Sequence, residues 1–578
     1  MKVSLNWLKE FVDIKITPEE LANRMALSFV EVDEIIKFDE IYKDVVVGEI
    51  KEIKKHPNAD NLSVAKVSIG KKKIQIIIGQ GLILAVGTKF PVVIAPAELP
   101  SGMVVEKRAI RGVESEGMIG ANKELGLDWL QGDITFFDKK IKTGTPISKA
   151  MGLGDAILDL DILSNRPDLF SHLGVSREIS AVTGLKLKKY NWGELKEDSK
   201  IKVDTLLDVE IRDKKLCPRY EARVLENVKI KESPDWLKNR LSALGIRPIN
   251  NIVDITNYVM IETGQPMHAF DFATLTGVKK KSIVVRRAKS GEEIITLDDK
   301  KRRLTKDSLI ITDGKKAIGI AGVMGGKETE VTEKTKTIIL EAANFSWPSI
   351  RKTSRLLGLR SEAVNRFEKG LDPNITSLAL DRAAYLISSL AEGKIAIGKI
   401  DEKYTNYADK KIQVSLNKIE KILGFSVKSL EVKKSLESLG MTVEIKGDFI
   451  DLIVPSYRMD IKEDVDIIED VARIIGYDKV PSSVPKGGLI PPKQNDDVEK
   501  ELFIKNTLVG LGLAEVYTYS FIGEELIRTF GDSVNKYLEL KNPLSPDRAY
   551  LRKNLVYSLA ECAIENAKNF DELSIFEI

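Results

Sequence analysis

Cysteine and histidine are scarce in this chain of 578 residues, which contains two cysteines and three histidines. Cys217 and Cys562 lie far apart and form no CxxC pair, so the sequence predicts neither a disulfide framework nor a cysteine-based metal site. The N-terminal segment MKVSLNWLKEFVDIKI lacks the apolar core of a signal peptide. No run of about 18 apolar residues occurs that would span a membrane. A protein of the reducing cytoplasm, without a membrane anchor, is therefore expected.

A strong excess of charge of one sign is also lacking. The net charge is +3 and the pI is about 8.3, which is too mild to indicate a nucleic-acid binder by itself, although local basic runs can still contact phosphates. Hydrophobic residues make up 43% of the chain and charged residues 30%, as in ordinary soluble globular proteins. The length allows several domains.

Changes in the hydrophobic period divide the chain into segments. Thr17-Pro18-Glu19-Glu20 has the composition of a capped helix start. From Asp44 onward, short β-rich runs separated by turns predict a small barrel of the OB-fold type. Strands mixed with helices then predict an α+β region. The expected boundaries are 1–38 and 151–200 for the segments before and after the barrel, 39–150 for the barrel, 205–400 for the α+β region, 408–480 for a helical domain, 481–496 for a proline-rich linker and 497–578 for a last domain.

Basic residues accompany the turns and edges of the predicted barrel. A barrel face that carries them is suited to follow a phosphate backbone. The alternative is that they only keep the edge strands soluble. The six candidates for RNA contact are Lys54, Lys55, Lys66, Lys107, Arg108 and Arg111.

The stretch from Asn250 to Asp271, NNIVDITNYVMIETGQPMHAFD, combines amides, a carboxylate and His268 with apolar residues that resemble strands. Such a run of hydrogen-bonding groups is typical of the lining of a binding pocket. The alternative is that His268 is a hydrogen-bonded core or turn residue, and that the glycines after Met324 only form a turn. A helix expected over about 169–183, after the Asn-Arg-Pro-Asp turn, is interpreted as structural.

Acidic residues cluster from Asp460 to Asp478. Asp466, Glu469 and Asp470 have the spacing i, i+3 and i+4, so they share one face of a helix, and Asp460 lies just ahead of it. Carboxylate oxygens in this arrangement suit Mg²⁺. The alternative is that acids in a first helical turn complement the helix dipole without any metal.

These segments, in this order, resemble bacterial phenylalanyl-tRNA synthetase β subunits. KKHPNADNLSVAKV and RAIRGVESEGMIGANKELGL are similar to the ends of the family's tRNA-binding barrel. The stretch with His268, VMGG, ILEAANF and LLGLRSEAVNRFEKGLDP are similar to its editing domain. PSYRMDIKEDVDIIEDVARIIGY is similar to its B5 domain, NRPDLFSHLGVSREISAVTG to its B1 segment, and FIKNTLVGLGLAEVYTYSF to the start of its catalytic-like domain.

The resemblance implies a multidomain α+β protein with an inserted OB-fold barrel, a B3/B4 editing module, a helical or winged-helix-like B5 domain and part of a catalytic-like antiparallel sheet domain. It implies that the chain stops inside this last domain. It also implies an (αβ)₂ assembly with an α subunit, which holds the aminoacylation site and ATP, and binding of tRNA(Phe). Bound Mg²⁺ is implied at Asp460, Asp466, Glu469 and Asp470.

The resemblance further implies that the chain hydrolyses tyrosine wrongly attached to tRNA(Phe). A second site is useful because an apolar pocket rejects an added hydroxyl by only about 10²-fold. In the implied site, Glu341 binds the tyrosine hydroxyl, while a positioned water attacks the ester. The remaining implied contributions are donors from His268, Asn257 and the backbone around Gly325, contact of Ser361 with the tRNA end, and shaping of the pocket by Ala363.

The chain departs from the family pattern at two places. Ile78-Gly79-Gln80-Gly81 replaces a Cys-Gly-Ala-Pro-Asn type of turn in the barrel, and Asp470 replaces a glutamate that is one methylene longer. Two other functions stay open. One is a free-standing hydrolase that acts on mischarged tRNA, and the other is a tRNA-binding scaffold without catalysis.

Overall fold

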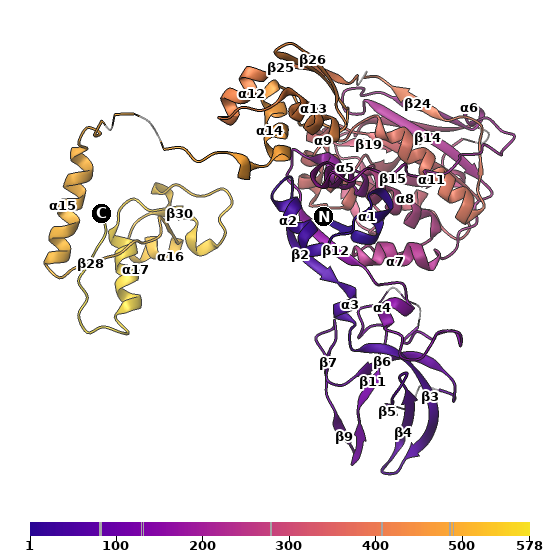
Figure 1. Ribbon diagram of the computed structural model, residues 1–578. Helices are drawn as coiled ribbons and strands as arrows, with labels where there is room; N and C mark the ends of the chain where they lie inside the picture. The colour runs from indigo at the N-terminus through magenta and orange to yellow at the C-terminus, as the bar shows by residue number, and fades with distance from the viewer. Residues whose placement is uncertain are drawn as a thin grey trace. The chain divides into compact units, whose positions relative to one another are not determined.

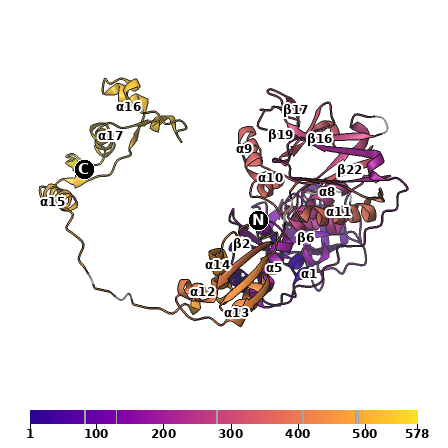
Figure 2. The ribbon, with the colours of Figure 1, turned by 90° about the horizontal axis from the view of Figure 1, so that it is seen from above.

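The computed structural model describes residues 1–79, 84–128, 130, 132–277, 280–405, 408–484, 487–488 and 490–578. They form two compact units, Met1–Ser482 and Ser483–Ile578, which are drawn as ribbons in Figures 1 and 2. Within this part of the chain, no helix is long and apolar enough to cross a membrane.

The first sheet joins two segments that flank an insertion. Its order is β1-β12-β2, and both pairs are antiparallel. Lys37 at the end of β2 pairs with Ala156 at the start of β12, so the chain leaves and re-enters this sheet at adjacent strand ends. The elements of this body are β1 (Lys2–Ser4), α1 (Leu5–Phe11), α2 (Pro18–Ala26), β2 (Glu31–Lys37), β12 (Ala156–Asp161) and α5 (His172–Thr183).

Local signals set the helix starts in this body. Thr17 caps α2 as predicted, with its hydroxyl accepting a hydrogen bond from the Glu20 amide at 3.2 Å. The helix expected from residue 169 begins at His172 instead, because Ser171 is its N-cap and accepts from the Gly174 amide at 2.9 Å. A short 3₁₀ turn at Pro167–Leu169 precedes it.

The insertion is a nearly closed β-barrel, as the strand-like runs predict. Its main sheet has the order β11-β6-β3-β4-β5. The amide of Glu116, just before β11, bonds the Gln75 carbonyl on β5 at 2.9 Å, which brings the two edges together. The elements are α3 (Phe38–Ile41), β3 (Val45–His56), β4 (Ala59–Ser68), β5 (Lys73–Gly79), β6 (Lys89–Ile94), β7 (Ala97–Glu98), β8 (Val104–Val105), β9 (Arg108–Ile110), β10 (Val113–Ser115), β11 (Gly117–Ile119) and α4 (Ile147–Ala150).

The α+β region consists of two sheets and two helical layers. The first sheet has the order β15-β22-β14-β23, with β24 also paired to β14, and the second has the order β13-β16-β19-β20-β21. Figure 2 shows β16 and β19 on one side of β22, with α8 and α11 on the other. The strands are β13 (Leu207–Ile211), β14 (Arg219–Glu226), β15 (Met267–Asp271), β16 (Lys281–Arg287), β17 (Glu293–Ile295), β18 (Lys301–Arg303), β19 (Leu309–Thr312), β20 (Ala317–Ile320), β21 (Met324–Gly325), β22 (Thr337–Asn344), β23 (Lys394–Ile395) and β24 (Ile400–Lys403). The helices are α6 (Val203–Leu206), α7 (Asp235–Ala243), α8 (Asn251–Thr263), α9 (Trp347–Leu357), α10 (Glu362–Phe367) and α11 (Ile375–Ala391).

The strand-like interpretation of the residues before His268 was wrong. Asn250–Asp271 forms a helix of 13 residues, α8, followed by the short strand β15. Asn250 caps the helix by accepting from the amides of Ile252 and Val253, both at 3.0 Å, and Gly264 ends it in the left-handed conformation with φ 88°. These caps outweigh the β-branched residues of the run.

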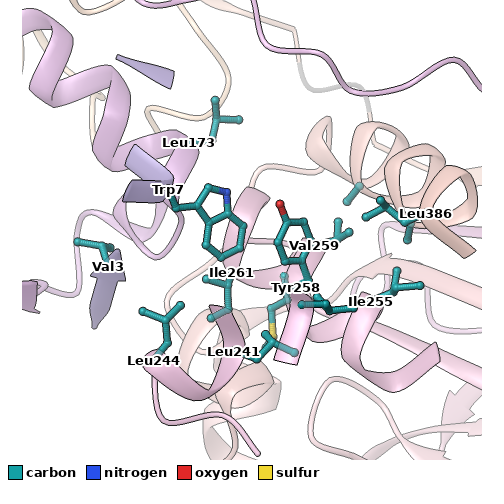
Figure 3. Packing of buried hydrophobic residues seen from close by; sticks show 14 of the residues in the cluster. Val3, Trp7, Leu173, Leu241, Leu244, Ile255, Tyr258, Val259, Ile261 and Leu386 are labelled. Atoms are coloured by element: carbon teal, nitrogen blue, oxygen red, sulfur yellow. The ribbon is translucent and has the colours of Figure 1, made fainter. Parts of the chain in front are cut away.

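One hydrophobic core joins the N-terminal body to the helical layer of the α+β region. Trp7 of α1 stacks between His172 of α5, with ring centroids 4.1 Å apart, and Tyr258 of α8, at 4.4 Å. Figure 3 shows Trp7 and Tyr258 among residues from both segments, including Val3 and Leu241. The two segments are therefore packed as one body.

The remaining elements form a small α/β module and the second unit. The module contains β25 (Lys410–Ser415), α12 (Leu416–Leu423), α13 (Ser429–Ser438), β26 (Thr442–Lys446), β27 (Phe449–Val454) and α14 (Asp464–Ile475), with sheet order β25-β27-β26. The second unit contains α15 (Asp496–Gly510), β28 (Ala514–Glu515), β29 (Phe521–Ile522), α16 (Glu524–Thr529), β30 (Tyr550–Leu551), α17 (Val556–Asn566) and β31 (Ile575–Phe576). Its expected antiparallel pairing holds for β29 and β30, whereas β28 and β31 run parallel.

Candidate active site

A single carboxylate interrupts the central strand β22, which is otherwise apolar from Ile338 to Ala343. Neighbouring residues of a strand point to opposite faces. Ile338, Leu340 and Ala342 pack in the core with the helices, whereas Ile339 and Ala343 pack in the core with the second sheet. Glu341 therefore points into the space between the two sheets.

A cavity of about 80 Å³ lies in this space. It is much smaller than the 300–1,000 Å³ that is typical of drug-sized ligand sites, so it suits one small group and a few waters. Strands β15, β20, β21 and β22 and helix α10 contribute to its walls. The lining residues are Pro266, Met267, His268, Phe270, Ile311, Gly319, Ile320, Gly322, Val323, Met324, Gly325, Glu341, Ala363 and Phe367.

Glu341 is held in the cavity by a buried tyrosine. The hydroxyl of Tyr220 on β14 donates a hydrogen bond of 2.5 Å to Oε2 of Glu341, and no hydrogen bond to Oε1 is formed within the described ranges. Burial raises the pKa of Glu341 to about 7, although the bond from Tyr220 acts to lower it. The carboxyl group is therefore near its titration midpoint at neutral pH.

His268 lies directly across from Glu341 in the pairing of β15 with β22, which places both side chains on one face. Burial lowers the pKa of His268 to about 4, so the imidazole is neutral near pH 7. Its Nε2 atom is buried and has no hydrogen-bond partner among the described residues. A buried polar atom without a partner at a cavity is a candidate for contact with a ligand or water.

Gly325 provides the space that the imidazole occupies. A Cβ atom at this position would lie 2.4 Å from Cε1 and 2.7 Å from Nε2 of His268. The backbone here is partly engaged, because the Gly325 carbonyl accepts from the Leu297 amide at 3.1 Å and the Gly326 amide donates to the Ile318 carbonyl at 2.8 Å. The glycine is thus required by close packing rather than only by a turn.

Helix α10 closes the cavity through Ala363 and Phe367. Ser361 is the N-cap of this helix, and its hydroxyl accepts from the Val364 amide at 3.2 Å. The same hydroxyl donates to the carbonyl of Val323, a lining residue, at 3.0 Å. Ser361 therefore anchors α10 to the turn between β20 and β21, without itself lining the cavity.

The structure brings four of the six expected site residues to the cavity: His268, Gly325, Glu341 and Ala363. Asn257 lies on α8 and does not line the cavity, because the run that holds it is helical rather than extended. Tyr220 was missed, because it is 121 residues from Glu341 and only the pairing of β14 with β22 reveals its position.

The six basic residues of the barrel are all exposed. Lys54 and Lys66 both form ion pairs with Glu52, and Lys107 lies 3.5 Å from Glu116. Lys55, Arg108 and Arg111 form no ion pair within the described ranges. The turn after β3 contacts the turn after β9, since Asn58 donates to the Arg111 carbonyl at 2.9 Å. The ends of β3 and β9 therefore lie side by side. Gln80 lies outside the described residues.

The acidic cluster is engaged by arginines and a helix start. Arg458 forms a two-pronged ion pair with Asp460, at 3.0 and 2.7 Å, and also contacts Asp470 at 3.0 Å. Asp466 accepts from the backbone amide of Glu463 at 2.8 Å and completes a capping box at the start of α14. Glu469 is exposed.

These contacts do not fit a Mg²⁺ cage formed by the four predicted ligands. Among the described residues, no group of three or more histidine, cysteine, aspartate or glutamate side chains is arranged to hold a metal ion. Asp460 and Asp470 would have to exchange arginine partners for the ion, and Asp466 would have to leave its cap. The spacing on the helix is as predicted, but it does not show which partners the carboxylates have.

Asp460 and Asp470 instead belong to a buried network of alternating charges. It connects the segment before and within α5 to α14 through ion pairs of 2.6 to 2.9 Å. Burial alone would raise the pKa of Glu178, but its two arginine neighbours lower that pKa to about 2. The order of contacts is Asp168, Arg166, Glu178, Arg473, Asp470, Arg458 and Asp460.

Four family models match the chain. Residues 45–146 match a putative tRNA binding domain, 216–392 a B3/4 domain, 412–477 a tRNA synthetase B5 domain, and 480–578 a phenylalanyl tRNA synthetase beta chain CLM domain. The architecture is thus a multidomain α+β arrangement that includes a nearly closed barrel.

Matches to curated proteins over the whole of this chain agree with these domains. The phenylalanine–tRNA ligase beta subunit of Syntrophus aciditrophicus is 39% identical over 589 aligned residues, which cover all of this chain and 72% of that protein. The beta subunits of Clostridium acetobutylicum and Carboxydothermus hydrogenoformans are both 40% identical and are covered to 73% and 72%. At this identity and coverage, the chain belongs to the β subunits of phenylalanine–tRNA ligase.

Proposed function

We propose that the cavity between the two sheets hydrolyses tyrosine esters of tRNA(Phe), so that this ligase subunit removes the mischarged amino acid. Water adds to the ester carbonyl, the bond to the ribose oxygen breaks, and tyrosine and tRNA leave. The observation that supports this most is Glu341, a buried carboxylate in a small apolar cavity with one oxygen bonded by Tyr220.

The carboxylate favours tyrosine over phenylalanine by hydrogen bonding. The hydroxyl of a tyrosine ring donates to Oε1 of Glu341, whereas a phenylalanine ring would leave that buried oxygen without a partner. A site built to bond a hydroxyl strongly disfavours the analogue that lacks it. Glu341 thus carries the discrimination that an apolar pocket does not achieve.

His268 is the group that contacts the attacking water. Its neutral ring and unpartnered Nε2 allow it to hydrogen-bond a water at the cavity. Ala363 limits the width of the cavity, and Ser361 holds the helix that carries it. Asn257 is not needed in this arrangement, so we restrict the site to His268, Gly325, Glu341 and Ala363, with Ser361 and Tyr220 as positioning residues.

The barrel supplies RNA contacts in this proposal. Lys55, Arg108 and Arg111 support it most, because they are exposed and lack ion-pair partners within the described ranges, whereas Lys54, Lys66 and Lys107 would have to exchange their carboxylate partners for phosphates.

The second unit supplies the contact with the α subunit in an (αβ)₂ assembly. Helix α15 supports this, because none of its 15 residues is buried and Phe503 is 71% exposed. The finer division of the chain remains part of the proposal: a discontinuous first domain around an OB-fold barrel, an editing module over 205–400, a winged-helix-like module over 408–480 and a catalytic-like domain over 497–578. Binding of Mg²⁺ at the acidic cluster also remains a proposal, which the arginine contacts do not support.

The test is deacylation of Tyr-tRNA(Phe) and Phe-tRNA(Phe) by the chain with and without an α subunit. We expect preferential loss of the tyrosine ester, and Glu341→Gln should lower the Tyr/Phe rate ratio by about 10- to 100-fold, the value of one hydrogen bond to a charged group. Glu31→Gln, an exposed glutamate of β2, is the control.

The same assay separates the alternatives. Equal activity without the α subunit would support a free-standing hydrolase. The absence of selective hydrolysis in both conditions would leave a tRNA-binding scaffold, and the proposal for the cavity would be withdrawn.

A further inference from the structure

A second hollow of about 360 Å³ shares helix α10 with the cavity. We call it the arginine groove. Helix α9, the turn that follows it and helix α10 form its walls. The lining residues are Arg351, Ser354, Arg355, Gly358, Arg360, Val364, Asn365 and Glu368.

Helix α10 is a thin partition between the two hollows. Ala363 and Phe367 line the cavity, whereas Val364 and Glu368 line the groove. Each pair has the spacing i, i+4, and the pairs are offset by one residue, so they occupy adjacent faces of the helix. A chain that lies in the groove is therefore about one helix width from the cavity.

The groove carries unbalanced positive charge. The guanidinium groups of Arg351, Arg355 and Arg360 are exposed, and within the described ranges none of them forms an ion pair. Glu368 is the one acidic residue in the lining. By contrast, Lys352 on helix α9 forms an ion pair with Asp307 at 2.7 Å. Three free guanidinium groups favour planar, two-pronged contacts with phosphates.

The local backbone keeps the groove open. Arg351 and Arg355 are one turn apart on α9, and Gly358 ends that helix in the left-handed conformation with φ 62°. A Cβ atom on Gly358 would meet nothing within 4 Å, so the space beside this glycine in the groove is open. Trp347, one turn before Arg351, is 49% exposed. Positive groups beside an exposed aromatic ring are typical of surfaces that bind single-stranded nucleic acid.

From this placement we infer that the arginine groove binds the phosphates of the single-stranded 3′ end of aminoacylated tRNA, while the aminoacyl group enters the cavity. The inference extends the proposed function, because the tyrosine side chain of an aminoacyl group on the last nucleotide can reach Glu341 only if the preceding nucleotides follow the surface beside the cavity. The groove beside α10 offers the required charge next to that point.

The test is binding of two RNA probes to the chain in complex with an α subunit. One probe is tRNA(Phe) with tyrosine attached through a stable 3′ amide, and the other is tRNA(Phe) without its last three nucleotides. We expect the triple variant Arg351→Gln, Arg355→Gln, Arg360→Gln to lose roughly tenfold or more in affinity for the first probe at low salt, with a salt slope smaller by about 2. Affinity for the shortened probe should not change.

A triple control removes the same charge at exposed positions outside the groove: Arg24→Gln, Arg303→Gln and Lys411→Gln. Equal losses in the control and the groove variant, or equal losses for both probes, would overturn the inference. Normal affinity for both probes together with weaker binding of the α subunit would also overturn it, and would identify the groove as a contact for an acidic protein surface.

Binding and hydrolysis are independent readouts, so the two proposals fail separately. A selective loss of binding by a complex that does not hydrolyse Tyr-tRNA(Phe) would retain the groove and reject the editing function. Selective hydrolysis with unchanged binding in the groove variant would retain the editing function and reject the groove.

Discussion

At the scale of single residues, the chemistry of the cavity depends on a pair of side chains that sit on neighbouring strands. Tyr220 and Glu341 are both almost fully buried, and the hydroxyl of one fixes the carboxyl orientation of the other. A buried carboxylate with a single donor remains costly to ionise, which explains why the pKa of Glu341 stays near 7.

We expect Tyr220→Phe to raise the pKa of Glu341 further, because the lost hydrogen bond stabilises the ionised form. Stability linked to Glu341 is fully present below its unfolded pKa of 4.5 and is lost as the pH rises through about 7. In the variant this loss should begin at the same pH, continue to higher pH and be larger. Thermal unfolding and deacylation, each measured from pH 5 to 9, should show the shift.

Glu341→Gln is the matched comparison for Tyr220→Phe, since it removes the titrating group. In this variant the part of the pH dependence that Glu341 causes should disappear from both the thermal unfolding and the deacylation measurements. If the pH profile of Tyr220→Phe coincided with that of the wild type, Tyr220 would be only a packing residue.

At the scale of elements, the sequence predicts local features better than pairings between distant segments. The helix α2 and its Thr17 cap were predicted from neighbouring residues. The run before His268 was misassigned because its β-branched residues favour strands, whereas the caps at Asn250 and Gly264 decide for a helix. The partners of Asp460 and Asp470 were missed although Arg458 and Arg473 lie only two and three residues away from them. Spacing alone does not show that these pairs are buried and joined to Glu178 of α5.

The charged network between α5 and α14 leads to a prediction for Arg458→Met. The change leaves Asp460 and Asp470 buried without that cation, which should destabilise the chain by about 3–5 kcal/mol. Since the pKa of Glu178 is lowered to about 2, its contribution is complete above pH 4.5 and is lost as the pH falls toward 2. Thermal unfolding at pH 7 and below pH 4 measures both effects.

Lys411→Met, at an exposed position on β25, is the control for Arg458→Met, and a similar Tm in both variants would contradict the network's role. The same unfolding experiment tests Mg²⁺. Asp466→Ala should cost about 1 kcal/mol through its lost cap, with or without Mg²⁺. A Mg²⁺-dependent rise in Tm that occurs only in the wild type would instead support the metal site.

At the scale of the whole molecule, the two units differ in how well they cover their apolar surface. Among the residues that the structure describes, the first unit has five hydrophobic clusters, whereas the second has one small cluster around Ile522, Ile527 and Tyr537. Large apolar side chains of the second unit stay exposed, with Phe503 at 71% and Leu511 at 72%. Exposed apolar surface is typical of a protein–protein interface, so the second unit is expected to gain stability when its partner binds.

We expect Phe503→Asp to weaken assembly with the α subunit by about 1.5–3 kcal/mol, the value of burying one large apolar side chain. Sedimentation of the mixed subunits measures this change. Leu430→Asp, an exposed leucine on α13 in the first unit, is the control. Normal assembly of Phe503→Asp would show that α15 lies outside the interface.

The chain enters and leaves the inserted barrel at adjacent positions, both in the host sheet and within the barrel itself. Lys37 pairs with Ala156 in the host sheet, and within the barrel the Val47 amide bonds the Thr145 carbonyl at 2.9 Å. A short turn between the two host strands would complete an ordinary hairpin, so the host sheet does not need the barrel for its own connectivity. The junction is therefore a natural grafting point, where another domain with adjacent termini can replace the barrel without rebuilding the cavity between the two sheets.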